Sequence, residues 1–437
     1  MPFFPPEVDE LMQTLIRFGY GAYAVGGCVR DILLGKQPSD YDVTTDATPE
    51  EVLRLFGEKA KPTGLKHGTV TVGQTEVTTF RTEGAYADHR HPDTVHFTRR
   101  LEDDLCRRDF TVNAMAMDIS GRLTDLFGGQ TDLQNGIIRA VGDPKERFCE
   151  DALRMLRALR FASVLGFSVS PETEKALYEE KELLTTVAGE RVRVETEKLL
   201  LGDAAAEVLL RYPAVLGVVL PEILPSVGFS HRNPHHCYDV WEHSVRALAA
   251  LPKDAALRWA MLFHDLGKPA VAAYDEEAGR LRFVGHQKAS RDLAAPALAR
   301  LRFSREDTER ILCLVEWHDA PVEATPRSAR RLLHRFGERD ARGILEMRRA
   351  DNLAQHPKYR DFQQTVRDCL ACVERVLAEK ECFSLASLAV RGEDVLARGY
   401  RGAEVGEELN RLLEEVIAGE LPNEREALLA ALPPKEK

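Results

Sequence analysis

The sequence contains no long apolar run. No window approaches the ~18 consecutive apolar residues that a membrane-spanning helix needs, and the start, MPFFPPEVDELMQTLIRFGY, has neither a basic leader nor a long apolar core. Low-complexity tracts are also missing, and the 44% of apolar and 30% of charged residues are typical of globular proteins. These absences argue against a membrane partner and predict a cytoplasmic protein.

Cysteine pairs and surplus positive charge are scarce too. The eight cysteines are scattered, and the close pair Cys369 and Cys372 falls in a helix-like run, so we expect reduced thiols. The net charge of −11 gives no general attraction for nucleic acid, which normally binds through Lys and Arg. A nucleic-acid-binding function would therefore need local basic clusters. Such clusters occur at Arg99-Arg100, Arg107-Arg108, Arg154/Arg157/Arg160 and Arg327 to Arg335.

The most informative stretch reads YAVGGCVRDILLGKQPSDYDVTTD, from Tyr23 to Asp46. Its first residues, Tyr23 to Val25, predict a strand that breaks at Gly26-Gly27 and is followed by a helix over Cys28 to Leu34. Glycines let a backbone approach a ligand closely, and a helix start offers N–H groups suited to phosphate. This half of the stretch therefore predicts a phosphate cradle, although a lone Gly-Gly is most often a turn.

The second half of the stretch contains two aspartates. A strand is predicted over Asp40 to Val43, where alternation places Asp40 and Asp42 on the same face. Paired carboxylates are hard oxygen ligands for Mg²⁺. An isolated Asp-x-Asp is usually surface or turn chemistry, but beside a glycine cradle it indicates metal-assisted nucleotidyl transfer.

The order and spacing of these motifs, GGxVRDxLLG followed by SDYDVTTDATPEEV, resemble the class II nucleotidyltransferases of the polymerase-β superfamily. That group comprises tRNA CCA-adding enzymes and bacterial poly(A) polymerases. The resemblance implies catalytic, Mg²⁺-binding roles for Asp40 and Asp42, and triphosphate-binding roles for Gly27 and Arg30.

A third carboxylate lies in the predicted hairpin Thr69 to Phe80, whose turn is expected at Gly73-Gln74. Glu76, on its second strand, is either another catalytic metal ligand or an edge-strand residue in solvent. The resemblance favours the metal role, because the family has a carboxylate at this EVTTFR position.

Two further segments precede the middle of the chain. The polar run from Thr82 to Leu105 predicts a mobile loop, and the resemblance implies that it is the flexible loop needed to add the final A. The segment RRDFTVNAMA matches the family's second motif, RRDFTxNA, which implies that Arg108 holds the triphosphate and Asp109 orients it. Without the resemblance, this Arg-Arg-Asp would be taken for a surface salt bridge.

The run EDALRMLRALRF predicts one helix from Glu150 to Phe161, with leucines on one side and charged residues on the other. The charged side is either a solvated ion-pair stripe or a nucleotide-selecting edge. Cytosine and adenine both present an amine donor beside a ring acceptor, so an acceptor such as Asp151 next to a donor such as Arg154 would accept both bases and repel uracil and guanine. The family's EDxxR motif is assigned this role. The candidate nucleotide-binding residues here are Asp151, Arg154, Arg157 and Arg160.

A second set of candidate catalytic residues follows Pro225. Two histidines and two aspartates in the order H…HD…D suit a divalent transition metal and resemble the HD-domain phosphohydrolases. The resemblance implies the ligands His243, His264, Asp265 and Asp351. Asp319 is a rival to Asp351, and His286 and His318 are candidates to assist a phosphate. Any one of these histidines alone would be taken for a core residue.

We therefore expect an α+β protein: a polymerase-β-like head (1–140), an all-α neck with the selecting helix (141–225), an HD domain (226–355) and a helical tail (356–437). The predicted function is template-independent addition of CCA to tRNA from CTP and ATP, with Mg²⁺ at the head, a divalent transition metal possible at the HD site, and no DNA partner. One alternative is an A-adding enzyme or a poly(A) polymerase. Poly(A) polymerases usually carry the motif EDPVRMLRA, which has Pro at the position of Ala152 in this chain. Another alternative is a regulatory RNA-binding protein in which the HD domain alone is active.

Overall fold

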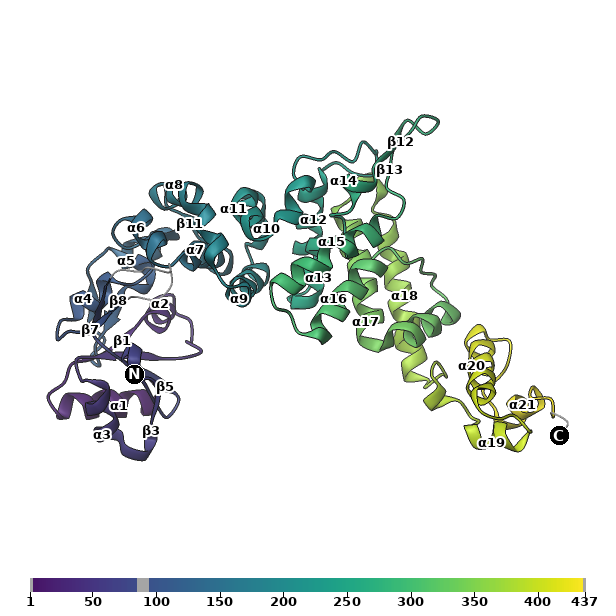
Figure 1. Cartoon of the computed structure of the whole chain (residues 1–437), viewed down its shortest axis with the longest axis horizontal. Helices are drawn as coiled ribbons and strands as arrows, with labels where there is room; N and C mark the ends of the chain where they lie inside the picture. The colour runs from purple at the N-terminus through teal and green to yellow at the C-terminus, as the bar shows by residue number, and fades with distance from the viewer. Residues whose placement is uncertain (1–2, 85–93, 435–437) are drawn as a thin grey trace. The chain divides into compact units, whose positions relative to one another are not determined.

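The computed structural model describes residues 3–84 and 94–434, which form two compact units. Unit 1 comprises Met1–Leu224 with Arg300–Arg302, and unit 2 comprises Pro225–Ala299 with Phe303–Lys437. Figure 1 labels their helices and strands. Within the described ranges, no helix has the length and apolar character needed to span a membrane.

Unit 1 opens with a mixed sheet of seven strands in the order β3-β4-β5-β2-β1-β8-β9. β2 runs antiparallel to β1 and parallel to β5, so the starts of β2 and β5 lie side by side. The strands are β1 (Ala22–Val25), β2 (Asp42–Thr45), β3 (Ala60–Gly64), β4 (Thr69–Val72), β5 (Thr75–Thr79), β8 (Met115–Met117) and β9 (Leu123–Asp125). Their inward side chains are fully buried, as at Ala24, Val43 and Val77, so the sheet is a rigid base for the residues at its edge.

The head helices begin where the sequence signals them. Thr48 caps its helix with a reciprocal bond to Glu51, and Pro49 occupies the first position, where proline is favoured. The hairpin prediction is confirmed, because β4 and β5 flank Gly73. The head helices are α1 (Pro6–Arg17), α2 (Gly27–Leu33), α3 (Pro49–Phe56), α4 (Leu101–Cys106) and α5 (Gly129–Asn135). Short 3-10 turns are η1 (Gly57–Lys59), η2 (Leu65–His67) and η3 (Thr111–Asn113).

Two local predictions for the head are wrong, and one of the two alternatives for Glu76 is excluded. Asp40 lies in a bend, and β2 begins only at Asp42. Glu76 is not on an edge strand, because β5 pairs with β4 on one side and β2 on the other. The expected loop from Thr82 to Leu105 is structured at both ends, by a ribbon of β6 (Arg81–Glu83) with β7 (Val95–Phe97) and by α4; its residues 85–93 lie outside the described ranges.

The rest of unit 1 is helical, apart from the short parallel pair β10 (Ile137–Ile138) and β11 (Ser168–Val169). The prediction of one continuous helix from Glu150 to Phe161 is wrong, because one helix ends at Glu150 and the next begins at Leu153. Asp151 between them has extended backbone angles, and its carboxylate accepts the Leu153 N–H as a cap. The elements are α6 (Pro144–Glu150), α7 (Leu153–Leu165), α8 (Pro171–Glu180), η4 (Lys181–Thr186), α9 (Gly189–Leu200), α10 (Ala205–Arg211), α11 (Pro213–Val219) and η5 (Pro221–Ser226).

Unit 2 is a helical bundle with one small hairpin of β12 (Ala273–Asp275) and β13 (Arg280–Arg282). α12, α13, α16, α17 and α18 pack on one another, and a second core near the C-terminus joins α19 and α20. The helices are α12 (Val240–Ala249), α13 (Ala255–Phe263), α14 (Lys268–Val271), α15 (His286–Arg300), α16 (Arg305–Trp317), α17 (Pro326–Ala354), η6 (Pro357–Tyr359), α18 (Phe362–Ala378), η7 (Leu385–Ser387), α19 (Gly392–Ala397), α20 (Ala403–Ala418) and α21 (Arg425–Ala430). The predicted domain boundaries within the two units stay predictions.

Candidate functional site

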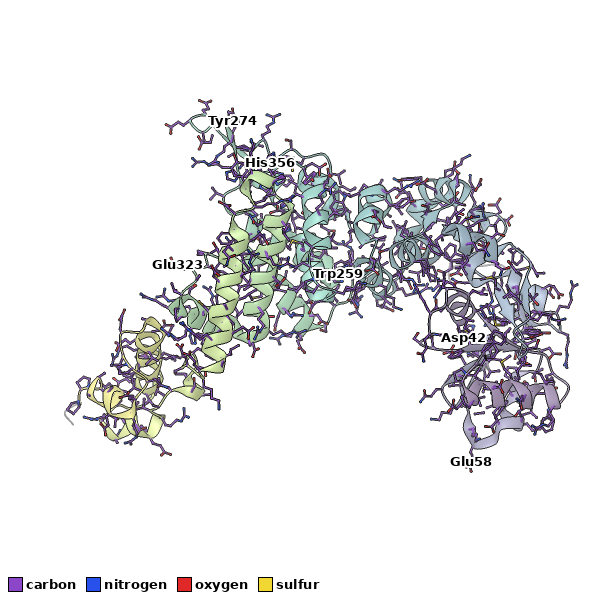
Figure 2. The ribbon with its side chains drawn as sticks, turned by 180° about the vertical axis from the view of Figure 1, so that it is seen from behind. Asp42, Glu58, Trp259, Tyr274, Glu323 and His356 are labelled. Atoms are coloured by element: carbon purple, nitrogen blue, oxygen red, sulfur yellow. The ribbon has the colours of Figure 1, made fainter. Side chains whose placement is uncertain are left out.

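Three carboxylates gather at the end of the head sheet where β2 and β5 begin. Asp42 is directly opposite Glu76 in the parallel pairing of β2 with β5, and Asp40 precedes Asp42 by two residues. Partial burial and repulsion from Asp40 and Glu76 raise the pKa of Asp42 to about 6, against the opposing charge of Arg108. Such mutual repulsion marks a place where a divalent cation would be stabilised. Asp42 is labelled in Figure 2.

The glycine turn faces these carboxylates. Gly26 has a φ of 74°, which only glycine adopts readily, and the place of its absent Cβ is 3.3 Å from Nη1 of Arg108 and 3.9 Å from Oδ2 of Asp42. Gly27 then begins α2, so the helix start, an arginine and a metal-type carboxylate meet at one point. The predicted residues Gly27, Arg108 and Asp42 are therefore brought together, and a triphosphate would find both cation and N–H groups there.

A buried aspartate that we did not predict holds Arg108 in place. Asp104, on α4, has no exposed surface and accepts hydrogen bonds from Arg107 at 2.8 Å, Arg108 at 3.1 Å and the Thr44 hydroxyl at 3.3 Å. Burial would raise the pKa of Asp104, but the two arginines outweigh it and hold the pKa below its ordinary value. Nε of Arg108 is buried without a hydrogen-bond partner in the described part of the chain. Arg108 is thus fixed by one edge of its guanidinium and has a donor left for an anion.

Three of the other predicted arginines of the head and neck form a second group around Phe161. The guanidinium carbons of Arg30, Arg157 and Arg160 lie 5.4, 5.4 and 4.0 Å from the centre of this ring. Arg30 also donates to Asn113 at 2.8 Å. The three guanidiniums can lie close together because each also has a polar or acidic partner. Together they would attract an anion that approaches α2.

The partners of Arg157 and Arg160 are buried acids. Arg157 donates to Asp109 through Nε at 2.8 Å and Nη2 at 2.5 Å, while Arg160 pairs with Glu195 at 3.0 Å. Burial opposes ionisation of Asp109, but Arg157 keeps its pKa below the ordinary value. The predicted Asp109 therefore orients Arg157 and contacts the N–H of Phe110. Whether it also orients a triphosphate stays a prediction.

The predicted base-selecting pair is arranged differently from our expectation. Asp151 accepts from Arg191 at 2.9 Å, whereas Arg154 donates to Glu150 at 2.5 Å and to the Arg107 carbonyl at 3.1 Å. The two side chains therefore have separate partners. The sequence gives no sign that Arg191 meets Asp151 across forty positions.

In unit 2 the four predicted HD residues converge. His243 comes from α12, His264 and Asp265 follow α13, and Asp351 is near the end of α17. Nε2 of His243 is 2.7 Å from Asp351, and Nε2 of His264 is 3.3 Å from Asp265 and 3.5 Å from Asp351. One ligand atom from each lies within 4.8 Å of the others. Nε2 of His264 and Oδ1 of Asp265 are buried without hydrogen-bond partners in the described ranges, which fits a cation at this point.

A second group shares Asp265 with the first. His286 and His318 place ligand atoms within 4.8 Å of Asp265 and of each other, and their Nε2 atoms are 3.3 Å apart. Burial lowers the pKa of His318 to about 3, so its imidazole is neutral, as a metal ligand must be. Lys268 was not predicted, yet its Nζ lies 2.6 Å from Asp265. Asp319, the rival candidate, instead accepts from Arg348 at the surface.

Comparisons with known proteins agree with the separation of the head carboxylates from the HD residues. Residues 22–139 match the family described as the poly A polymerase head domain, residues 166–225 match the probable RNA and SrmB-binding site of polymerase A, and residues 235–355 match the HD domain. The two sets of side chains therefore lie in the two kinds of domain that the resemblance implied.

Full-length relatives share one name. A CCA-adding enzyme of Lactobacillus helveticus is 37% identical over 96% of this chain and 94% of its own length. One of Levilactobacillus brevis is 35% identical over 98% of both chains. The crystal structure of the Bacillus stearothermophilus CCA-adding enzyme in complex with CTP is 32% identical, covers 98% of this chain and 97% of its own, and has a TM-score of 0.75. With its carboxylates, glycine turn and arginines in one head domain, this chain belongs to the family of CCA-adding enzymes.

Proposed function

We propose that this chain adds the terminal CCA to tRNA from CTP and ATP, and that the carboxylates of Asp40, Asp42 and Glu76 hold Mg²⁺ for the reaction. The observation that carries the proposal is the meeting of these carboxylates with Gly26 and Arg108 at one edge of the sheet. Family membership supplies the reaction, and a tRNA substrate makes the cytoplasm the expected place of action.

The donor set fits Mg²⁺. Its members are carboxylate oxygens alone, which are the ligands that this hard cation prefers, and their repulsion raises the pKa of Asp42. When bound, such a metal lowers the pKa of an attacking hydroxyl and neutralises charge on the phosphates.

The chain's own residues bind and orient the nucleotide. The N-terminal N–H groups of α2 and the free Nε of Arg108 would donate to the triphosphate, with Asp104 keeping the guanidinium of Arg108 in place. Arg30, held by Asn113, faces the same helix start and adds positive charge. These groups are fixed before substrate arrives, so little reorganisation accompanies binding.

Base selection is assigned to Asp151 and Arg154. Asp151 accepts from Arg191 and Arg154 donates to Glu150, so contacts of these two side chains with a base would compete with those ion pairs. If Asp151 accepts from the exocyclic amine of C or A, Asp151→Ala removes the acceptor that repels uracil and guanine. A mispaired buried polar group costs ~1–3 kcal/mol, so preference should relax by about tenfold to a hundredfold.

The test is incorporation of each of the four triphosphates on tRNA that lacks CCA. Wild type should add C, C and A; addition of A alone would support the A-adding alternative. Asp42→Ala and Asp40→Ala should abolish addition with Mg²⁺ while the melting temperature stays near wild type. Activity within tenfold of wild type in either variant would overturn the metal-ligand roles.

Arg191→Ala serves as the matched variant for Asp151→Ala. It releases Asp151 from its partner but leaves the acceptor present, so selectivity should persist. An unchanged base preference in Asp151→Ala would place selection elsewhere and leave Asp151 as a helix cap.

A second activity is supported by the HD residues. We infer that His243, His264, Asp265 and Asp351 hold a divalent transition metal and hydrolyse a phosphate ester, because one ligand atom from each lies within 4.8 Å of the others. When bound, such a metal activates water for attack. The neutral imidazole of His318 and the ammonium of Lys268 are placed to contact a phosphate beside this metal.

Purified protein should hydrolyse a 2′,3′-cyclic phosphate or a phosphomonoester with Mg²⁺, Mn²⁺, Ni²⁺ or Co²⁺. Absence of activity with all four would make this domain structural.

A further inference from the structure

Two histidines of unit 2 lie close to the HD residues but outside the candidate metal-binding groups. His231 and His236 belong to the segment that precedes α12, and their rings stack at 3.8 Å between centres. His231 has 1% of its surface exposed. The polar nitrogens of a ring buried this deeply need partners. The partners of His231 therefore indicate its role.

The backbone fixes the position of His231. Ser230 pairs with Asp239 in an antiparallel bridge, so the segment between them is a closed loop. The carbonyl of Arg232 accepts the N–H of Leu281 on β13 at 3.4 Å (Figure 1). Arg232 has a φ of 41°, which residues other than glycine adopt only where the surrounding structure imposes it. The loop thus holds the His231 ring in one place.

The hydrogen bonds of His231 fix its tautomer. Nδ1 lies 3.1 Å from the carbonyl oxygen of Tyr238, which only accepts, so Nδ1 carries the hydrogen. Burial and the neighbouring charge of Lys268 lower the pKa of His231 to about 3, so the ring is neutral. Nε2 therefore has a free lone pair, and it lies 3.3 Å from Nζ of Lys268. His231 offers Lys268 a neutral acceptor at a fixed point.

The ammonium of Lys268 has two acceptors. Besides His231, it bonds to Oδ2 of Asp265 at 2.6 Å, and the ring centre of Phe283 lies 5.6 Å from Nζ. Lys268 is 7% exposed, so its charge lies inside the protein. An ammonium has three N–H donors, and in the described ranges no further oxygen or nitrogen accepts from this one. One donor is left for a phosphate oxygen.

A single carboxylate would not hold Lys268 in one place. The four-carbon stem of lysine is flexible, and an ammonium can approach a carboxylate oxygen from several directions. Asp265 is also a candidate metal ligand, so a bound cation would weaken its attraction for Lys268. His231 is outside that group of ligands and keeps its lone pair for Lys268. Because it is neutral, it leaves the positive charge available to an anion.

We propose that His231 is a positioning residue of the HD site, which holds the ammonium of Lys268 beside Asp265 so that its free N–H donates to a phosphate oxygen of the substrate. This inference rests on the proposed hydrolysis of a phosphate ester by the HD residues. His231 supplies neither a metal ligand nor a proton to the reaction. Its effect on the substrate passes through Lys268 alone.

The experiment is a double-mutant cycle on full-length protein saturated with Mn²⁺. It measures the Kd of inorganic phosphate by calorimetry and kcat/KM for a phosphomonoester. His231→Phe keeps a flat ring but removes the acceptor, so phosphate binding and kcat/KM should each fall about tenfold to a hundredfold. Lys268→Met should lose at least as much. Because His231 acts through Lys268, the double variant should match Lys268→Met alone.

Two further variants separate positioning from packing. His235→Phe makes the same change in the same loop, at a ring that stacks on Tyr359 at 4.0 Å and, among the described residues, has no hydrogen bond to Lys268. It should bind phosphate as wild type does. His231→Gln restores an acceptor and should recover most of the loss. Mn²⁺ content after dialysis and nucleotide addition should be unchanged in His231→Phe.

The outcomes are distinct. Effects that multiply in the double variant, an equal loss in His235→Phe, or loss of Mn²⁺ from His231→Phe would overturn the inference. If His231→Phe does not fold, His231→Gln decides, because weak phosphate binding with an unchanged melting temperature would also overturn it. If wild type hydrolyses no ester but the cycle shows coupling, the proposed hydrolysis fails and the role of His231 stands. If wild type binds no phosphate, the inference fails as well.

Discussion

Asp104 shows how one buried side chain prepares a site that it does not enter. It joins the Arg107 and Arg108 guanidiniums to the Thr44 hydroxyl of β2, and so ties α4 to the strand that begins with Asp42. Such a carboxylate is stable in the interior only because two cations meet it. We expect its removal to affect both stability and nucleotide binding.

For Asp104→Asn, the unfolding free energy should fall by about 3 kcal/mol at pH 7, because two arginines lose a buried partner. The folded pKa of Asp104 is lowered, so its stabilisation is complete above its ordinary value of 3.8 and is lost as pH falls below it. The difference between variant and wild type should therefore shrink as pH falls toward 4 and below. Urea unfolding across this range measures it.

Glu102→Gln is the control for this prediction. Glu102 is on the same helix but pairs with Arg100 at the surface, where an ion pair contributes close to zero to the free energy of unfolding. Equal losses in the two variants would contradict the role of Asp104.

At the residue scale the sequence predicted which side chains lie together better than it predicted their hydrogen-bond partners. Asp42, Glu76, Arg108 and the HD residues were recognisable because their motifs fix residue type and order. Asp104 was not, since an acidic run such as EDDL looks solvated when read alone. Its burial depends on β2, which is distant in the sequence.

At the scale of elements, the turn between β1 and α2 determines how closely a ligand can approach. Gly26→Ala should cost about 1–3 kcal/mol in stability, because φ is positive, and should also raise the KM for nucleotide. The added Cβ would lie 3.3 Å from Nη1 of Arg108, so this guanidinium must move. Steady-state kinetics and thermal melting measure the two effects separately.

Gly73→Ala is the matched control for the glycine turn. Gly73 also has a positive φ, of 63°, but an added Cβ would meet nothing within 4 Å. It should lose comparable stability and keep the wild-type KM. A raised KM in both variants would mean that instability alone explains the effect.

The break between α6 and α7 permits another prediction. Ala152 has a φ of −58°, which suits a proline ring, and Asp151 before it is extended, as a residue preceding proline prefers. Ala152→Pro should therefore leave stability unchanged or raise it by up to about 1 kcal/mol. A large loss of stability in a melting experiment would contradict this reading of the break.

The sequence predicted most elements from periodicity and caps, and its errors have a common cause. The run Glu150 to Phe161 has helical periodicity throughout, but the side chain of Asp151 caps α7 and so separates it from α6. Asp40 lies in an alternating segment, yet β5 pairs with β2 only from Asp42 onward. In both cases a tertiary or capping interaction overrides a local pattern.

At the scale of the whole molecule, the two sets of candidate metal-binding residues belong to different compact units. The carboxylates of the head are in unit 1, and the HD residues are in unit 2. Order along the chain was sufficient to predict this separation, because each motif set is contiguous in sequence.

Separate units should give separable activities, which two reciprocal variants test. His264→Ala removes a buried ligand of the HD site and should reduce phosphohydrolysis at least a hundredfold while CCA addition stays within twofold of wild type. Asp42→Ala should abolish CCA addition and leave phosphohydrolysis unchanged.

His264 is fully buried and its loss leaves a cavity, so Asp351→Asn, which keeps the side-chain volume, serves as a second variant and should give the same result as His264→Ala. Metal content after dialysis provides an independent readout, since each variant should lose metal from its own unit alone. If CCA addition falls in both His264→Ala and Asp351→Asn while melting is unchanged, the two sites are coupled and the units do not act independently.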